Sequence, residues 1–227
     1  MPRGHQTASP SGGRRRSVFM RKPWIPAEEQ LLFSGYLFIM DGSEDRDRRD
    51  IVRKVILYIA MSLDGLIADS GGNVDWLHGQ DRTVEDIDTY PAFIKDIDTV
   101  VMGWRTYHQI VTELSPEEWP YPALTSYIIT HRALPSTKDL KFVREDPCEA
   151  VQRLRQTPGR GIWICGGAEI VRPLVRADLI DEYHISIVPT LLGSGIRLWG
   201  ETERELKLKL TRAQSYNGIA ELVYTRR

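Results

Sequence analysis

The chain has 227 residues and a nearly balanced charge, with 30 Lys and Arg against 31 Asp and Glu. A net charge of −1 excludes a general attraction to nucleic acid or anionic membranes, and the length allows one sizeable core with an appendage. The two cysteines, Cys148 and Cys165, lack a metal-binding spacing, and no apolar run reaches the roughly 20 residues of a membrane helix. We therefore expect a cytoplasmic globular protein without a metal, nucleic-acid or membrane partner.

Residues 1–53 differ in composition from the rest, because they are rich in Pro, Gly, Ser and Arg and end in a dense run of charges. This composition predicts a disordered or poorly ordered N-terminal extension. Its short apolar run at 31–40 resembles a signal peptide, but two glutamates interrupt the approach and no small-residue cleavage site follows Met40. We expect no signal peptide, and a folded domain at 54–227.

The folded part alternates apolar runs of strand length with helical segments. Strands are expected at 54–60, 99–103, 126–130, 141–144, 161–166 and 182–188, and helices at 84–96, 105–111, 147–156 and 168–176. Pro91 kinks or splits the first helix. Two last strands, near 207–214 and 220–225, flank the hairpin signal Asn217-Gly218. This order implies an α/β fold with a mainly parallel sheet and an antiparallel edge.

Two glycines, Gly166 and Gly167, end one of these strands and precede a helix. Backbone amides in a turn without side chains can approach a ligand closely, and the first amides of a helix have no partner inside it. Such a site suits a phosphate or pyrophosphate, although Gly-Gly after a strand can also be only a turn. Ligands of parallel sheets collect at the carboxyl ends of the strands, where this pair lies.

Five segments resemble the dihydrofolate reductase superfamily, and more closely its branch with the reductase domain of bacterial riboflavin biosynthesis. They are Ser62–Ala68, Met102–Tyr107, Ile129–Arg132, Cys165–Ala168 and Pro189–Gly195. The resemblance implies a three-layer, dihydrofolate-reductase-like α/β fold with an antiparallel C-terminal hairpin. It also implies an NADPH-dependent oxidoreductase, homodimeric, that transfers hydride to a small molecule. The substrate would be pterin-like or a riboflavin precursor of the 5-amino-6-(5-phosphoribosylamino)uracil type.

The same resemblance implies the cofactor site, in which the glycine pair is joined by a cis peptide and the amides after it face the pyrophosphate. Many relatives carry Arg directly after the glycine at position 103, but this chain has Trp104. NADH is therefore not excluded, unless Arg105, His131 or Arg132 supplies charge near the ribose 2′-phosphate. Arg105 could also be a solvated helix residue and His131 a loop residue. The cofactor-binding positions carried over are Ala60, Ile67, Gly103, Arg105, Thr106, Thr130, His131, Gly166, Gly167, Ala168, Glu169 and Ile170.

Asp64 is the candidate catalytic residue, as a substrate ligand or proton relay in the loop over the nicotinamide. The alternative is a turn residue whose carboxylate bonds the backbone before Gly65. Asp86 and Asp88 lie near the position where true dihydrofolate reductases grip the pterin, but a solvated helix face explains them equally well.

The substrate is expected over Tyr58, the first helix and the loop at 192–195, which could instead be only a strand connection. No zinc-deaminase motif is present, so only the reduction is expected of this chain. Two other readings stay open: a nucleotide-binding module without turnover, and a structural partner protein that uses its extension.

Overall fold

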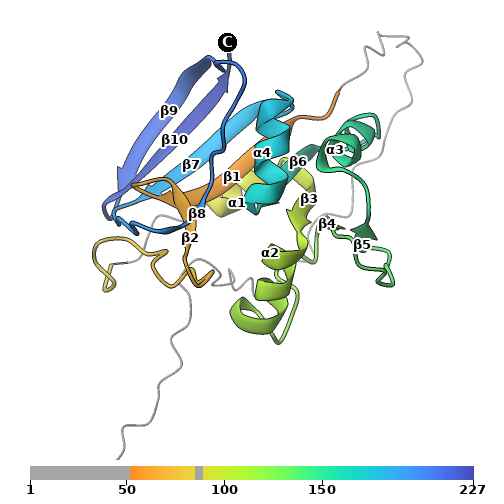
Figure 1. The fold of residues 1–227 in the computed structure, drawn as a ribbon, viewed down its shortest axis with the longest axis horizontal. Helices are drawn as coiled ribbons and strands as arrows, with labels where there is room; N and C mark the ends of the chain where they lie inside the picture. Colours follow the sequence, from red (N-terminus) through yellow and green to blue (C-terminus); the bar gives the residue numbers. More distant parts are fainter. Residues whose placement is uncertain (1–51, 85–88) are drawn as a thin grey trace, which may run out of the picture.

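The computed structural model describes residues 52–84 and 89–227, which Figure 1 shows as a ribbon. The expected extension lies outside the described residues up to residue 51, as do Asp86 and Asp88. Among the residues that are described, no helix is both long enough and apolar enough to span a membrane.

The described residues form a central eight-stranded sheet. Its strands are β1 (Val55–Ser62), β3 (Ile97–Gly103), β4 (Thr125–Ile129), β5 (Leu140–Val143), β6 (Gly161–Gly166), β7 (Glu182–Val188), β9 (Leu208–Tyr216) and β10 (Ile219–Arg226). They lie in the order β5-β4-β3-β6-β1-β7-β10-β9. The first six strands of this order, from β5 to β7, are all parallel to one another, and β10 is antiparallel to both of its neighbours, β7 and β9. The expected sheet with its antiparallel C-terminal hairpin is confirmed.

Helices cover both faces of this sheet. They are α1 (Tyr90–Ile94), α2 (Trp104–Gln109), which continues as the π-helix Ile110–Leu114, α3 (Pro147–Arg155) and α4 (Ala168–Arg176). Figure 1 shows α4 in front of the sheet and α1 behind β1. The three layers expected from the resemblance are therefore present.

The alternation of β1 explains the two faces, because successive side chains of a strand point to opposite sides. Val55 and Leu57 belong to one hydrophobic core with residues of α3 and α4. Ile56 and Tyr58 pack in a second core with residues of α1 and α2. Burial of each large apolar side chain contributes about 1.5–3 kcal/mol, so both cores stabilise the central strand. A continuous apolar run is what such a strand requires.

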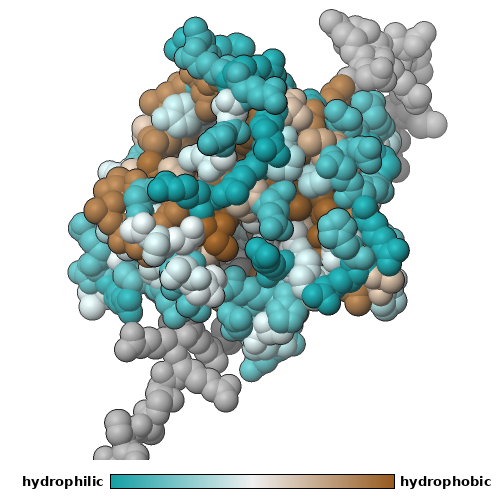
Figure 2. All heavy atoms as spheres, in the orientation of Figure 1, coloured by the Kyte–Doolittle hydropathy of each residue, from teal (hydrophilic) through white to brown (hydrophobic). Residues whose placement is uncertain are grey.

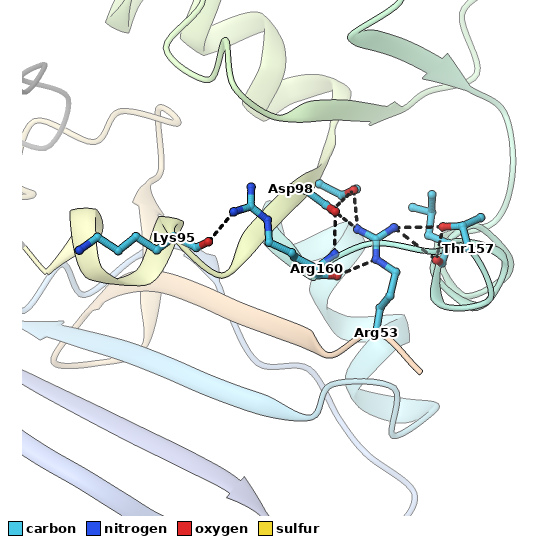
Figure 3. Close-up of polar contacts among 7 residues, drawn as sticks. Arg53, Lys95, Asp98, Thr157 and Arg160 are labelled. Atoms are coloured by element: carbon cyan, nitrogen blue, oxygen red, sulfur yellow. Dashed lines mark hydrogen bonds and ion pairs between the residues drawn. The ribbon is translucent and has the colours of Figure 1, made fainter. Parts of the chain in front are cut away.

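Arg53 connects the amino ends of the strands (Figure 3). It is only 5% exposed, and its guanidinium pairs with Asp98 and donates to Thr99 Oγ1 at 2.7 Å and Thr157 Oγ1 at 3.0 Å. Its Nε donates to the carbonyl oxygen of Arg160 at 2.7 Å. The sequence prediction placed Arg53 in the extension, because a run of charges precedes it. Its burial makes it part of the folded unit.

A second, two-stranded sheet was not expected. Its strands β2 (Leu66–Asp69) and β8 (Gly195–Arg197) are antiparallel. Gly195 has φ +148°, and a Cβ atom on it would lie 2.1 Å from the carbonyl oxygen of Ala68. The two strands approach closely there, so the position accepts only glycine.

The expected first helix was wrong at its start. Val84 is not helical, and α1 begins at Tyr90, so that Pro91 lies in its first turn. The missing N–H of proline is tolerated there because that donor has no partner inside the helix.

Candidate active site

A cavity of about 1820 Å³ lies at the carboxyl ends of β1, β3, β4 and β6. Figure 2 shows a hollow near the middle of the face in view, bordered by apolar and polar residues. A pocket for one drug-sized ligand measures roughly 300–1,000 Å³, so this cavity has room for a dinucleotide and a second molecule. Eleven of the twelve expected cofactor positions line it, namely Ala60, Ile67, Gly103, Arg105, Thr106, Thr130, His131, Gly167, Ala168, Glu169 and Ile170.

The twelfth position, Gly166, is not among the residues that line the cavity. A cis peptide joins it to Gly167, as the resemblance implied. Gly166 has φ +124°, and a Cβ atom on it would lie 3.3 Å from Ile59 Cδ1. Backbone conformation and space therefore both favour glycine at this position.

The amino ends of α2 and α4 meet at one end of the cavity, because the adjacent strands β3 and β6 run parallel into them. A Cβ atom on Gly103 would lie 3.2 Å from Ile170 Cγ1 and 4.0 Å from the backbone nitrogen of Gly167. A Cβ atom on Gly167 would lie 3.4 Å from Thr106 Oγ1. The two glycines therefore leave a side-chain-free surface between two helix starts.

This surface can hold an anion through backbone amides. The Ile170 amide donates to the carbonyl oxygen of Gly167 at 3.0 Å, so it is already bonded. The Ala168 and Glu169 amides have no acceptor among the described residues, as is usual in the first turn of a helix. Arg105 and Glu169 approach each other to 3.5 Å at the exposed rim. Three amides were expected to face a pyrophosphate, and two of them, those of Ala168 and Glu169, are available to bind it.

A cation lies beside the strand end at which the sequence predicted the adenine ribose. The guanidinium carbon of Arg132 is 4.7 Å from the ring centroid of Trp104, a cation–π geometry, and both residues line the cavity. Arg144 lines the same region, after β5. Thr130 is buried, and its hydroxyl oxygen accepts the Arg132 amide at 3.2 Å. This chain has Trp instead of Arg at position 104, and the Trp104 ring stabilises the positive charge of Arg132 at the end of the neighbouring strand.

The other end of the cavity is aromatic. Tyr58, Tyr90, Tyr121 and Trp163 line it, and Tyr121 and Trp163 meet edge to face at 5.0 Å between ring centroids. Cys165 also lines it, but burial raises the pKa of its thiol to about 12. A thiol with this pKa stays protonated near neutral pH and is a poor nucleophile. This end suits a planar ring, and Cys165 supplies no reactive group to it.

Asp64 does not line the cavity. Its carboxylate accepts hydrogen bonds from Ser62 Oγ at 2.6 Å, the Gly193 amide at 2.7 Å and the Leu192 amide at 3.1 Å. The Ser62 bond contributes most to lowering the pKa of Asp64 to about 2. Hydrogen bonds to the charged form keep the carboxylate ionised, and they tie it to Ser62 and to the backbone of the loop at 192–195.

The loop at 192–195 also lies outside the cavity lining, whereas the next residue, Ile196, is in it. The substrate is therefore not expected over that loop. Its amides bond Asp64, and its last residue begins β8.

Two polar residues near the aromatic end were missed. Thr89 lines the cavity beside Tyr58, and Glu221 lies buried behind Thr89. They are separated by 132 positions in the chain. No local motif links them, and Glu221 looks like an ordinary polar residue of a hairpin strand.

A family model, described as the RibD C-terminal domain, matches residues 53–220. The uncharacterised protein YwjB of Bacillus subtilis strain 168 is 39% identical over 176 residues, which cover 77% of this chain and 98% of YwjB.

Two solved structures share the fold. A Shewanella sp. PV-4 protein whose name assigns it to riboflavin biosynthesis is 28% identical, with a TM-score of 0.66 over 77% of this chain and 99% of that one. The dihydrofolate reductase of Enterococcus faecalis, solved with NADP(H), is 15% identical, with a TM-score of 0.56 over 76% of this chain and 96% of that one. At such low identity the second likeness concerns the fold alone.

Proposed function

Since the chain belongs to the RibD C-terminal domain family, whose relatives support a reductase-like function, we propose that it reduces a small heterocyclic substrate with NADPH. The substrate is a pterin or a riboflavin precursor of the 5-amino-6-(5-phosphoribosylamino)uracil type. One observation carries the proposal: the amino ends of α2 and α4 meet across Gly103 and Gly167 at one end of a cavity whose other end is aromatic.

The residues present fit NADPH. The Ala168 and Glu169 amides suit its pyrophosphate, and the positive ends of two helices favour the charge. Arg132, stacked on Trp104, suits the ribose 2′-phosphate. NADPH, when bound, supplies the hydride.

The protein then has to orient the two rings and exclude water. Ala60 and Ile67, which line the cavity from β1 and β2, would flank the nicotinamide. Tyr58, Tyr90 and Trp163 cover the adjacent apolar space, where the substrate ring would lie. Because Asp64 bonds backbone amides elsewhere, we propose that the proton comes from water.

The test is a titration of the full chain with NADPH and with NADH, followed by nicotinamide fluorescence. Gly167→Ala adds a methyl group between Thr106 and Ile67 at ordinary contact distance, so the fold should persist while both nucleotides bind more weakly. Arg132→Ala should weaken the binding of NADPH about tenfold, which corresponds to the loss of one charge-assisted hydrogen bond, and should weaken the binding of NADH less than twofold. Arg153, which lies over Tyr127 outside the cavity lining, provides the matched control Arg153→Ala. Failure of wild type to bind either nucleotide would reject the proposal.

A nucleotide-binding module without turnover is the alternative, and the bonding of the Asp64 carboxylate to amides of the loop at 192–195 favours it. NADPH oxidation with dihydropterin, riboflavin-precursor and simple carbonyl substrates separates the two. Binding of NADPH without oxidation by any of them would favour the module.

A further inference from the structure

Arg172 is an arginine of the cavity lining that the proposed function leaves unused. It lies in the second turn of α4, four positions after Ala168, so the two residues share one face of the helix. Side chains of a helix lean toward its amino end. The Arg172 side chain therefore leans toward the first turn, where the Ala168 and Glu169 amides have no acceptor among the described residues.

Two neighbours fix this side chain without neutralising it. Arg172 Nη2 donates to the carbonyl oxygen of Arg197 in β8 at 2.5 Å. The stem of Arg172 packs on Gly200, where a Cβ atom would lie 3.1 Å from Arg172 Cδ. A carbonyl oxygen carries no net charge, so the guanidinium keeps its full positive charge. The place of this charge is thus set before a ligand binds.

The guanidinium of Arg172 has donors without acceptors. No carboxylate in the described part of the chain forms an ion pair with it, whereas Arg105 is paired with Glu169 at 3.5 Å. Arg172 Nε is buried and finds no acceptor within residues 52–84 and 89–227. A buried donor without an acceptor destabilises the protein, and an anion in the cavity would supply the acceptor.

The bond to β8 places this charge on the nicotinamide side of the glycine pair. Strand β8 pairs with β2, with Ile196 opposite Ala68, and both residues line the cavity. Ile67, the neighbour of Ala68 in β2, is one of the two residues proposed to flank the nicotinamide. Arg132, in contrast, follows β4, and Figure 1 shows β2 and β8 on one side of α4 and β4 on the other. The two arginines therefore face different parts of a dinucleotide.

We propose that Arg172 binds the pyrophosphate of the dinucleotide at the phosphate next to the nicotinamide ribose. The proposal rests on the reductase function above, and it adds a side-chain cation to the two backbone amides of that site. A guanidinium suits this role because its planar N–H groups match phosphate oxygens. NADPH and NADH share this phosphate, so Arg172 contributes equally to the binding of both, whereas Arg132 acts on the 2′-phosphate of NADPH alone.

The test measures the affinity of the full chain for NADPH and for NADH by nicotinamide fluorescence. Arg172→Met keeps a stem over Gly200 but removes the charge, so it should weaken the binding of both nucleotides at least about tenfold. Arg172→Lys, which keeps the charge but not the planar group, should weaken both only about threefold. Arg176, exposed in the last turn of α4 and outside the cavity lining, provides the control Arg176→Met, which should leave both affinities within about twofold.

Two further measurements identify the contact. The affinity for 2′,5′-ADP, which lacks the phosphate next to the nicotinamide ribose, should be the same in wild type and Arg172→Met within about twofold when measured by calorimetry. The NADPH affinity should depend less on salt in Arg172→Met than in wild type, because one pair of opposite charges is missing. A role of Arg172 in folding alone would not change the salt dependence.

The thermal midpoint of each variant without nucleotide separates binding from folding. If Arg172→Met unfolds, Arg172→Gln decides, because its amide can still donate to the Arg197 carbonyl oxygen while the charge is absent. Unchanged affinity for NADPH and NADH in the neutral variant, a loss confined to NADPH, or an equal loss for 2′,5′-ADP would overturn the proposal. Failure of wild type to bind either nucleotide would instead reject the reductase function on which the proposal rests.

Discussion

At the scale of single residues, Asp64 ties the β1–β2 turn to the glycine-rich loop at 192–195. Three hydrogen bonds hold its carboxylate as an anion, and they lower its pKa from 3.8 to about 2. A carboxyl whose folded pKa lies below its unfolded pKa stabilises the fold above the unfolded value. That contribution is lost as the pH falls through the folded value.

Asp64→Asn should therefore remove a pH-dependent part of the stability. The difference in unfolding free energy between wild type and variant is expected to be constant above about pH 4 and to shrink toward pH 2. Urea unfolding at a series of pH values measures it. Curves that stay parallel down to pH 2 would contradict the hydrogen bonding described for Asp64.

The residues of the cavity differ in how far the sequence could reveal them. Gly103, Gly167 and Thr130 each belong to a short motif at a strand end, so their neighbours along the chain identified them. Thr89 and Glu221 belong to no motif, and their contact spans 132 positions. Only the register of β10 on β7 brings Glu221 behind Thr89, and a single sequence does not contain that register.

At the scale of elements, the β9–β10 hairpin holds a loop whose residues line the cavity. Asn217, in the turn with φ +45°, accepts the Asp81 amide at 2.9 Å and donates to the Asp81 carbonyl oxygen at 2.9 Å. The next residues, Arg82 and Thr83, line the cavity. The C-terminal hairpin thus positions a loop that lies far from it in the sequence.

Asn217→Gly keeps a residue that tolerates positive φ but removes both side-chain bonds to Asp81. Exchange of the Asp81 amide hydrogen should become roughly tenfold faster, as the loss of about 1–2 kcal/mol of local bonding implies. Hydrogen–deuterium exchange measures this. The Gln80 amide is the internal control, because it donates to the backbone oxygen of residue 217, which remains. Equal acceleration at both amides would point to loss of the turn instead.

The central strands of the main sheet were predictable because they are apolar runs bounded by turn residues, and the turn Asn217-Gly218 identified the hairpin, including its largely polar strand β9. Strands β2 and β8 were not, because four and three residues give no usable alternation. Their pairing depends on the close approach at Gly195, which is a tertiary contact. The start of α1 was misplaced because helix-like composition before Thr89 was read without its tertiary context.

At the scale of the whole molecule, the two ends of the parallel sheet have different tasks. The cavity lies at the carboxyl ends of the strands. At the amino ends, the Arg53 side chain connects neighbouring segments through its contacts with Asp98, Thr99 and Thr157. Separation of this kind lets the amino ends be optimised for stability without constraining the site. The fold class, the order of the main-sheet strands and helices, and the position of the cavity followed from the sequence. That Arg53 belongs to the folded domain could not be predicted from the sequence, since its burial depends on partners far along the chain.

We propose that residues 52–227 fold without the residues before them, which makes the starting residue a test. A chain that starts at Val52 should melt at the same temperature as the full chain, and one that starts at Lys54 should melt lower. Removing a buried, bonded arginine costs about 3 kcal/mol, because it leaves Asp98 and Thr99 without their donor. For a domain of this size that corresponds to roughly 10 °C in the melting temperature.

Arg53→Ala in the full chain is the matched control, and it should lower the melting temperature as much as the start at Lys54 does. NADPH affinity should be equal in all four proteins when measured well below their melting temperatures, because Arg53 lies at the opposite end of the sheet from the cavity. A Val52 start that already lowers stability would show that residues before 52 contribute to the fold. A Lys54 start that changes nothing would show that the Arg53 contacts do not stabilise the domain.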